Sequence, residues 1–185
     1  MRSSKKKNRF WNSILYCVGL SRLLTVFVVF ISPFWAVITA HFLDAFDSIF
    51  AFKANYTWKQ YTKYDKYLDY WWYIFILIYS YDKPIWQIVL VLFILRSIGQ
   101  ILVFVTSKHE YLFWFPNILE HYFVLYVLTI TFFPSYLSLF EGSRVVWPLL
   151  IAPGTKMPQE YILHVKGWFY ESNTWPRSIT RIFNK

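Results

Sequence analysis

Long apolar segments separated by short polar ones make up most of this chain. The apolar segments cover approximately residues 14–32, 34–53, 65–81, 85–106, 111–133 and 145–165. Each is close to the ~20 residues that an α-helix needs to cross the hydrocarbon core of a bilayer. Turn signals such as Pro33 and Asp82-Lys83-Pro84 stand between them. The pattern predicts an all-α integral membrane protein with six transmembrane helices, the sixth interrupted at Pro153-Gly154.

The two ends of the chain differ from this bundle. Residues 1–10 are polybasic, and residues 8–18 place aromatic and aliphatic side chains at helical spacing beside that charge. Such a segment is typical of a short interfacial helix. The last residues are polar, aromatic and basic. We therefore expect a single membrane domain over 1–185, with a basic arm and interfacial helix over 1–18, the six-span bundle over about 19–165 and a tail over 166–185.

The composition agrees with a membrane location. The chain is 57% hydrophobic and 24% aromatic, and only 16% of its residues are charged, which is low for a soluble domain. Its net charge is +9, but the basic residues flank apolar segments, so anionic lipid headgroups are the expected partner and nucleic acid is not. The single cysteine, Cys17, excludes an internal disulfide framework and a cysteine-rich metal site.

The distribution of lysine and arginine predicts the orientation. If the N-terminus lies inside, the inner segments are the basic start, a polar loop over about 54–64, the segment 106–110 and the tail. These hold most of the basic residues, whereas the outer turns hold only Lys83 and Arg144. Cytoplasmic segments of membrane proteins carry such an excess. Both termini are therefore expected in the cytoplasm.

Four of the five aspartates lie close together in the sequence. Asp44 and Asp47 are three residues apart and Asp65 and Asp69 are four apart, so each pair shares one face of a helix. Carboxylates at the edge of an apolar segment are costly without partners, and divalent cations remove that cost. Ligand sets made of oxygen alone suit Mg²⁺, Mn²⁺ or Ca²⁺. We therefore expect a metal site at the cytoplasmic ends of the second and third spans, rather than solvated acidic residues.

The spacing of these residues resembles the signature of the CDP-alcohol phosphotransferase family, whose members are six-span enzymes of phospholipid synthesis. That signature is D-x-x-D-G-x-x-A-R, eight residues, then G-x-x-x-D-x-x-x-D. All four aspartates match, and the motif alanine falls on Ala51. Ser48 and Tyr61 stand where the motif has glycine, and Phe52 stands where it has arginine. The metal-binding half of the motif is thus kept, and the nucleotide-binding half is altered.

The resemblance implies a role for each aspartate. Asp44, Asp47 and Asp65 would bind two divalent cations, Mg²⁺ or Mn²⁺, that hold a pyrophosphate. Asp69 would act as the catalytic base on the hydroxyl of the acceptor alcohol, or would complete the metal site. The resemblance also implies a homodimer.

Further residues are candidates for binding a lipid or CDP-linked substrate. Ser48 and Ala51 continue the helix face of Asp44 and Asp47 with small side chains, which allow a ligand or another helix to come close. Arg22 in the first span is either a snorkelling side chain or a partner of phosphate or carboxylate. Arg22 and Arg96 are candidates to bind phosphate in place of the missing motif arginine.

Three functions fit this sequence. The first is a transferase that moves a substituted phosphate from a CDP-activated lipid or alcohol to a hydroxyl acceptor, with its active site on the cytoplasmic side. The second is a catalytically altered or inactive relative that binds metal and lipid. A cation transporter is a third, which is disfavoured because the carboxylates gather at one face rather than along the bundle.

Overall fold

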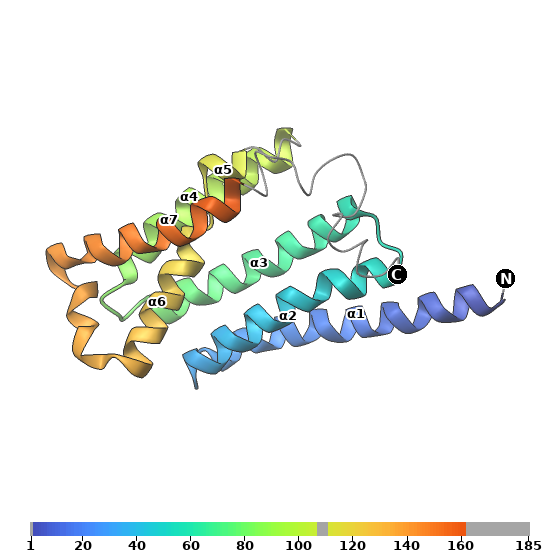
Figure 1. The fold of residues 1–185 in the computed structure, drawn as a ribbon, viewed down its shortest axis with the longest axis horizontal. Helices are drawn as coiled ribbons and strands as arrows, with labels where there is room; N and C mark the ends of the chain where they lie inside the picture. The colour runs from blue at the N-terminus through green and yellow to red at the C-terminus, as the bar shows by residue number, and fades with distance from the viewer. Residues whose placement is uncertain (1, 107–110, 162–185) are drawn as a thin grey trace. The chain divides into compact units, whose positions relative to one another are not determined.

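The structure, a computed structural model, describes residues 2–106 and 111–161. Within these ranges the regular elements are all helical, which confirms the all-α class. In chain order they are α1 (Arg2–Val28), α2 (Pro33–Lys53), α3 (Trp58–Ser80), α4 (Trp86–Thr106), α5 (Tyr111–Trp114), α6 (Ile118–Phe132), the 3₁₀ helices η1 (Pro134–Phe140) and η2 (Gly142–Val145), and α7 (Val146–Glu160) (Figure 1). The predicted tail, 166–185, lies outside the described residues.

Three helices are long and apolar enough to cross a membrane. They are the part of α1 from Arg9 to Val28, all of α2, and α4. This finding agrees with the predicted membrane location. The apolar helix α6 has 15 residues, or about 22 Å of helix, which is short of a ~30 Å hydrocarbon core. The arrangement with six spans therefore stays a prediction.

The chain divides into two compact units, and α3 contributes to both. The described part of the first unit is residues 2–72, and the second begins at Tyr73. In the first unit the chain reverses direction at residues 29–32, and α1 and α2 pack against each other. Trp71 of α3 donates a hydrogen bond from Nε1 to the carbonyl of Leu23 in α1, at 3.2 Å. Three helices thus meet within this unit.

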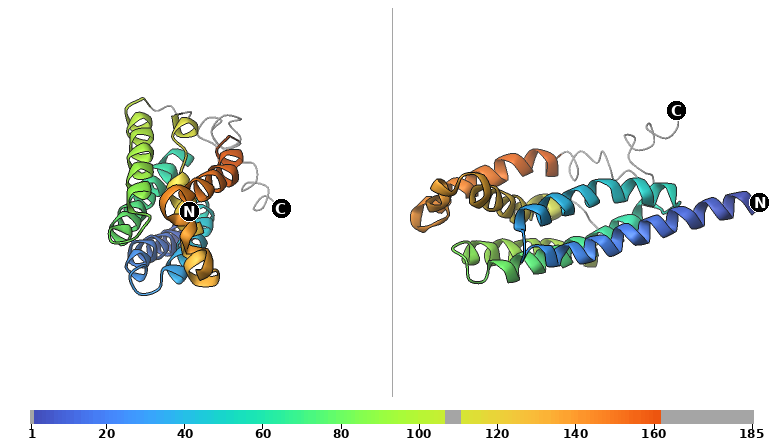
Figure 2. Two further views of the ribbon diagram at one scale, coloured as in Figure 1. Left: turned by 90° about the vertical axis from the view of Figure 1, so that its left-hand side faces the viewer. Right: turned by 90° about the horizontal axis from the view of Figure 1, so that it is seen from below.

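The segment predicted as an interfacial helix is helical and belongs to a longer helix. Residues 8–18 belong to α1, which runs without a break for 27 residues (Figure 2). Helix α1 contains no proline, and its one glycine, Gly19, lies close to Tyr64. A Cβ atom at Gly19 would stand 1.9 Å from the hydroxyl oxygen of Tyr64 in α3. Gly19 therefore serves the approach of two helices rather than ending one.

The loop between α2 and α3 is much shorter than the predicted 54–64. At the end of α2, Asn55 has a φ of 62°, its N–H donates to the carbonyl of Phe52, and the next N–H donates to that of Ala51. These two bonds form a Schellman motif, which satisfies the last carbonyls of a helix. Helix α3 then begins with a capping box: the Thr57 N–H donates to the Gln60 side chain at 2.9 Å, and the Gln60 N–H donates back at 3.3 Å. Only residues 54–57 separate the helices, and the later aspartate pair lies inside α3.

A small hydrophobic core holds the first unit together at this connection. Leu15 of α1 is 1% exposed, and it packs with buried residues of α2, of the connection and of α3, namely Ala51, Ala54 and Tyr61. Trp11 packs against this cluster and stacks on Phe50, with ring centroids 6.3 Å apart. This core fixes α1, α2 and α3 next to the aspartates.

The predicted fifth span, 111–133, is broken in the second unit. Helix α5 ends at Trp114 and α6 begins at Ile118, with Pro116 between them. Proline cannot donate the backbone hydrogen bond that would continue a helix. Arg96 of α4 is 3% exposed, and its Nη1 donates to the carbonyl of Phe115 at 3.0 Å, which satisfies the broken backbone. The break therefore has a partner on a neighbouring helix.

Two further features of the second unit are the continuity of α7 and the hydrogen bonds at the start of α6. Helix α7 continues through Pro153-Gly154, so the expected interruption is absent over Val146–Glu160. At the start of α6 the Asn117 side chain donates to the Tyr73 hydroxyl and to the Glu120 carboxylate, each at 2.7 Å. The costly carboxylate of Glu120 thus has a hydrogen-bond partner in this unit.

The close approach of α4 to the helix break predicts unequal effects of two glycine substitutions. A Cβ atom at Gly99 would lie 2.4 Å from Cβ of Phe115, whereas one at Gly154 meets nothing within 4 Å. Both changes to alanine gain up to ~1 kcal/mol of helix propensity, but the clash at Gly99 costs about 1–3 kcal/mol. We expect Gly99→Ala to lower the apparent melting temperature in detergent relative to Gly154→Ala. Equal melting temperatures would show that α4 does not pack this closely on Phe115.

Candidate metal centre

One arginine side chain lies among the four aspartates. From α1, Nη1 of Arg22 donates to Asp47 and to Asp65, the second at 3.1 Å. Its Nη2 donates to Asp69 and forms an ion pair with Asp44, each at 2.9 Å. Arg22 as a whole is 9% exposed. The structure thus favours the carboxylate-partner interpretation of Arg22 over the snorkelling one.

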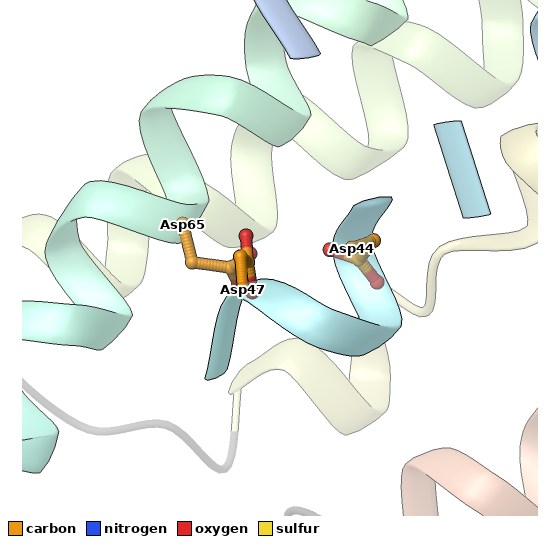
Figure 3. Close-up of side chains that lie close together, drawn as sticks. All are labelled: Asp44, Asp47 and Asp65. Carbon is orange, nitrogen blue, oxygen red and sulfur yellow. The ribbon is translucent and has the colours of Figure 1, made fainter. Parts of the chain in front are cut away.

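The aspartates reach this point from two helices of the first unit. Asp44 and Asp47 lie about one turn apart on α2, and Asp65 reaches toward Asp47 from α3 (Figure 3). The carboxylate of Asp47 is fully buried, those of Asp65 and Asp69 are mostly buried, and that of Asp44 is 53% exposed. The spacing places the two members of each pair on one helix face, and the packing of α2 and α3 brings the two faces together.

Three of the carboxylates could hold a metal ion. One oxygen from each of Asp44, Asp47 and Asp65 lies within 4.8 Å of the other two. Two oxygens that bind one Mg²⁺ ion at about 2.1 Å are at most about 4.2 Å apart, and the limit for Ca²⁺ at about 2.4 Å is about 4.8 Å. The donor set and its spread therefore fit one hard divalent cation, with a contraction of a few tenths of an ångström for Mg²⁺ or Mn²⁺.

Two side chains that the sequence analysis did not assign to the site also bind the carboxylates. The Tyr61 hydroxyl donates to Oδ1 of Asp47 at 2.6 Å. The Lys66 ammonium donates to Asp65 at 3.1 Å and to Asp69 at 2.9 Å. Helical spacing could have predicted both contacts, because Tyr61 precedes Asp65 by four residues and Lys66 precedes Asp69 by three, which places each on the helix face of an aspartate. In the comparison with the motif, Tyr61 counts only as a departure from glycine.

The two tyrosines at the start of α3 keep their protons. Burial raises the pKa of Tyr61 well above its ordinary value, and the charges of Asp65 and Asp47 raise it further. Burial, with a smaller contribution from Asp47, raises the pKa of Tyr64 to about 12. A phenol with such a pKa is a hydrogen-bond donor at neutral pH and not a base. Tyr61 therefore stabilises the charged form of Asp47 and does not take a proton itself.

Donors from the protein already occupy nearly all of the carboxylate oxygens. Arg22 forms an ion pair with one oxygen of each aspartate, Tyr61 donates to the second oxygen of Asp47, and Lys66 donates to the second oxygens of Asp65 and Asp69. Within the described residues these bonds reach seven of eight oxygens, and Oδ2 of Asp44 is the eighth. With all four carboxylates ionised, their charges exceed the two positive charges of Arg22 and Lys66 by two. One divalent cation would balance that excess.

The other predicted substrate-binding residues have different surroundings. Ser48 is partly buried on α2, next to Asp47. Ala51 is fully buried and packs in the cluster of Leu15 and Tyr61. Arg96 lies in the second unit, where it binds the carbonyl of Phe115. The structure thus brings Arg22 together with the four aspartates and gives Ala51 a packing role.

Comparison with known proteins found no match: no family model, no curated protein and no solved structure is significantly similar to this chain. The chemistry of the centre is therefore argued from its own residues. They provide an oxygen-rich, partly buried cluster that three helices assemble and two basic side chains partly neutralise.

The unequal burial of the α2 aspartates predicts unequal effects on stability. Asp47→Asn leaves a single acceptor oxygen where Arg22 and Tyr61 now use two, so one buried donor loses its partner. We expect a loss of about 1–3 kcal/mol in the absence of divalent cations. Asp44→Asn, at a half-exposed carboxylate, should cost under about 1 kcal/mol. Apparent melting temperatures in detergent with EDTA measure both variants, and equal losses would contradict the burial of Asp47.

Proposed function

We propose that this chain is an integral membrane phosphotransferase of phospholipid synthesis. It moves a substituted phosphate from a CDP-activated lipid or alcohol to the hydroxyl group of an acceptor. The observation that carries the proposal is the meeting of Asp44, Asp47, Asp65 and Asp69 at one point, with three of them able to hold a cation. Phosphoryl transfer needs positioned positive charge more than it needs covalent chemistry.

The proposal includes six spans with both termini and the centre on the cytoplasmic side. The asymmetry of lysine and arginine along the chain supports this orientation. In the first unit, Lys59 and Lys63 are exposed on the first two turns of α3, near the aspartates in sequence, where they suit anionic lipid headgroups. A lipid substrate that stays in the bilayer would then present its phosphate to the centre.

The residues of the centre have separate tasks in this reaction. Asp44, Asp47 and Asp65 would hold divalent cations, Mg²⁺ or Mn²⁺, which would supply positive charge to the pyrophosphate of the donor. A carboxylate oxygen of Asp69 accepts the proton of the acceptor hydroxyl, and the alcohol oxygen forms the new bond to phosphorus while cytidine monophosphate leaves. The carboxylate of Asp69 is mostly buried and hydrogen-bonded to Arg22 and Lys66, so its orientation is set before substrate binds.

The proposal predicts metal-dependent turnover that Asp69 controls. Membranes that contain the protein are supplied with Mg²⁺ or Mn²⁺, candidate CDP-activated lipids and candidate alcohols, and mass spectrometry follows the product. Asp69→Asn should lower the rate about 10²-fold or more, the usual contribution of a general base. Asp82→Asn is the matched control, because Asp82 lies in the turn after α3 and pairs with Lys83. Product formation that is equal in wild type and Asp69→Asn would refute this mechanism.

A second candidate is a relative that binds metal and lipid without turning over CDP substrates. Tyr61 favours it, since this side chain is buried and donates to Asp47 at the position where the motif has glycine. Phe52 at the motif arginine favours it as well, because it removes a bidentate phosphate ligand. This candidate predicts stabilisation by Mg²⁺ without detectable cytidine nucleotide binding. Saturable, Mg²⁺-dependent binding of a CDP-alcohol would exclude it.

A further inference from the structure

A guanidinium group bonded to the ligands of a metal centre is itself a counter-ion of that centre. Arg22 forms ion pairs with Asp44, Asp47 and Asp65, the three residues whose oxygens could hold a cation, and also with Asp69. We propose that Arg22 and a divalent cation are alternative counter-ions of these carboxylates, so that the cation binds only as the guanidinium leaves. The inference rests on the metal binding in the proposed function and not on catalysis.

The first argument is the occupancy of the carboxylate oxygens. A hard cation needs at least one oxygen from each ligand at about 2.0–2.6 Å. Arg22 holds one oxygen of each of Asp44, Asp47 and Asp65, and other protein donors hold the second oxygens of Asp47 and Asp65. A cation that binds all three must therefore either share oxygens with these donors or displace a donor. Arg22 is the described donor that these three carboxylates share.

The second argument is the charge within the cluster. A guanidinium and a metal ion bound to the same oxygens would lie a few ångströms apart and repel each other, more strongly at this depth than in water. The Arg22 side chain has the length to withdraw, because arginine carries its charge on a flexible stem. Exchange between the two counter-ions thus requires motion of one side chain and not of a helix.

The third argument is the stability of the unit without metal. Arg22 is on α1, Asp44 and Asp47 are on α2, and the other aspartates are on α3, so its bonds link all three helices. Removing a partner from a buried charged cluster leaves like charges uncompensated. Wild type is therefore stable without divalent cations, whereas a variant without this guanidinium depends on them.

The test is Mn²⁺ affinity, measured by electron paramagnetic resonance of the free ion with the purified full chain in detergent. Arg22→Gln removes the competitor and should bind Mn²⁺ at least about tenfold more tightly than wild type. Lys66→Gln is the matched control: it removes the same unit of charge from the cluster, where Lys66 donates to Asp65 and Asp69 from the α3 side. It should change the affinity by less than about threefold. In EDTA, Arg22→Gln should melt below wild type, and Mg²⁺ should raise its melting temperature more than that of wild type.

Several results would overturn the inference. They are Mn²⁺ binding by Arg22→Gln that is no tighter than in wild type, an equal tightening by Lys66→Gln, and no Mn²⁺ binding by either protein. An Arg22→Gln chain recovered only when Mg²⁺ is present throughout purification supports it. If that chain is recovered under neither condition, the variant to measure is Arg22→Lys, because a single ammonium reaches fewer of the carboxylates. Mn²⁺ binding by Arg22→Lys that is tighter than in wild type supports the inference, and unchanged binding refutes it. Tighter binding by Arg22→Gln in a protein without phosphotransfer would refute the catalytic proposal alone.

Discussion

Compensation of buried negative charge is the constraint on which the first unit depends. Four carboxylates within reach of one guanidinium repel one another, and each loses much of its hydration. The unit meets this cost from its own sequence: Arg22 comes from α1, and Lys66 and Tyr61 come from α3. The packing of Leu15 against Ala51 and Tyr61 serves the same end, because it keeps the three helices close enough for these bonds.

The short connection between α2 and α3 is the local condition for this arrangement. The Schellman motif at Asn55 ends α2, and the capping box of Thr57 and Gln60 starts α3 after only a few residues. A loop over 54–64 would have left the second aspartate pair at a fraying helix end. In the structure Asp65 and Asp69 lie about two and three turns after the start of α3, where the backbone orients their side chains.

Sequence reasoning succeeded where the determinants are local and failed where they are tertiary. The spacing of the aspartates was enough to predict their convergence, and apolar segment length was enough to predict the helical class and the spans of α2 and α4. The capping box of Thr57 can also be recognised in the sequence, although the polar and charged residues after it favour a loop. The partners of Arg22 lie 22 to 47 residues away, so helical periodicity could not identify them. The partner of the Phe115 carbonyl at the break before Pro116 is likewise Arg96, a residue of another helix.

The position of Arg22 also bears on the altered half of the motif. The family places an arginine at the site of Phe52, on the same helix as the first aspartates, whereas the guanidinium of this chain comes from α1. A guanidinium forms bidentate bonds with carboxylate and with phosphate alike. In the proposed function, a cation that held Asp44, Asp47 and Asp65 would deprive this guanidinium of its anionic partners, and a phosphate-bearing substrate would supply new ones. The counter-ion of the metal-free centre would then also be suited to bind that substrate, without the motif arginine.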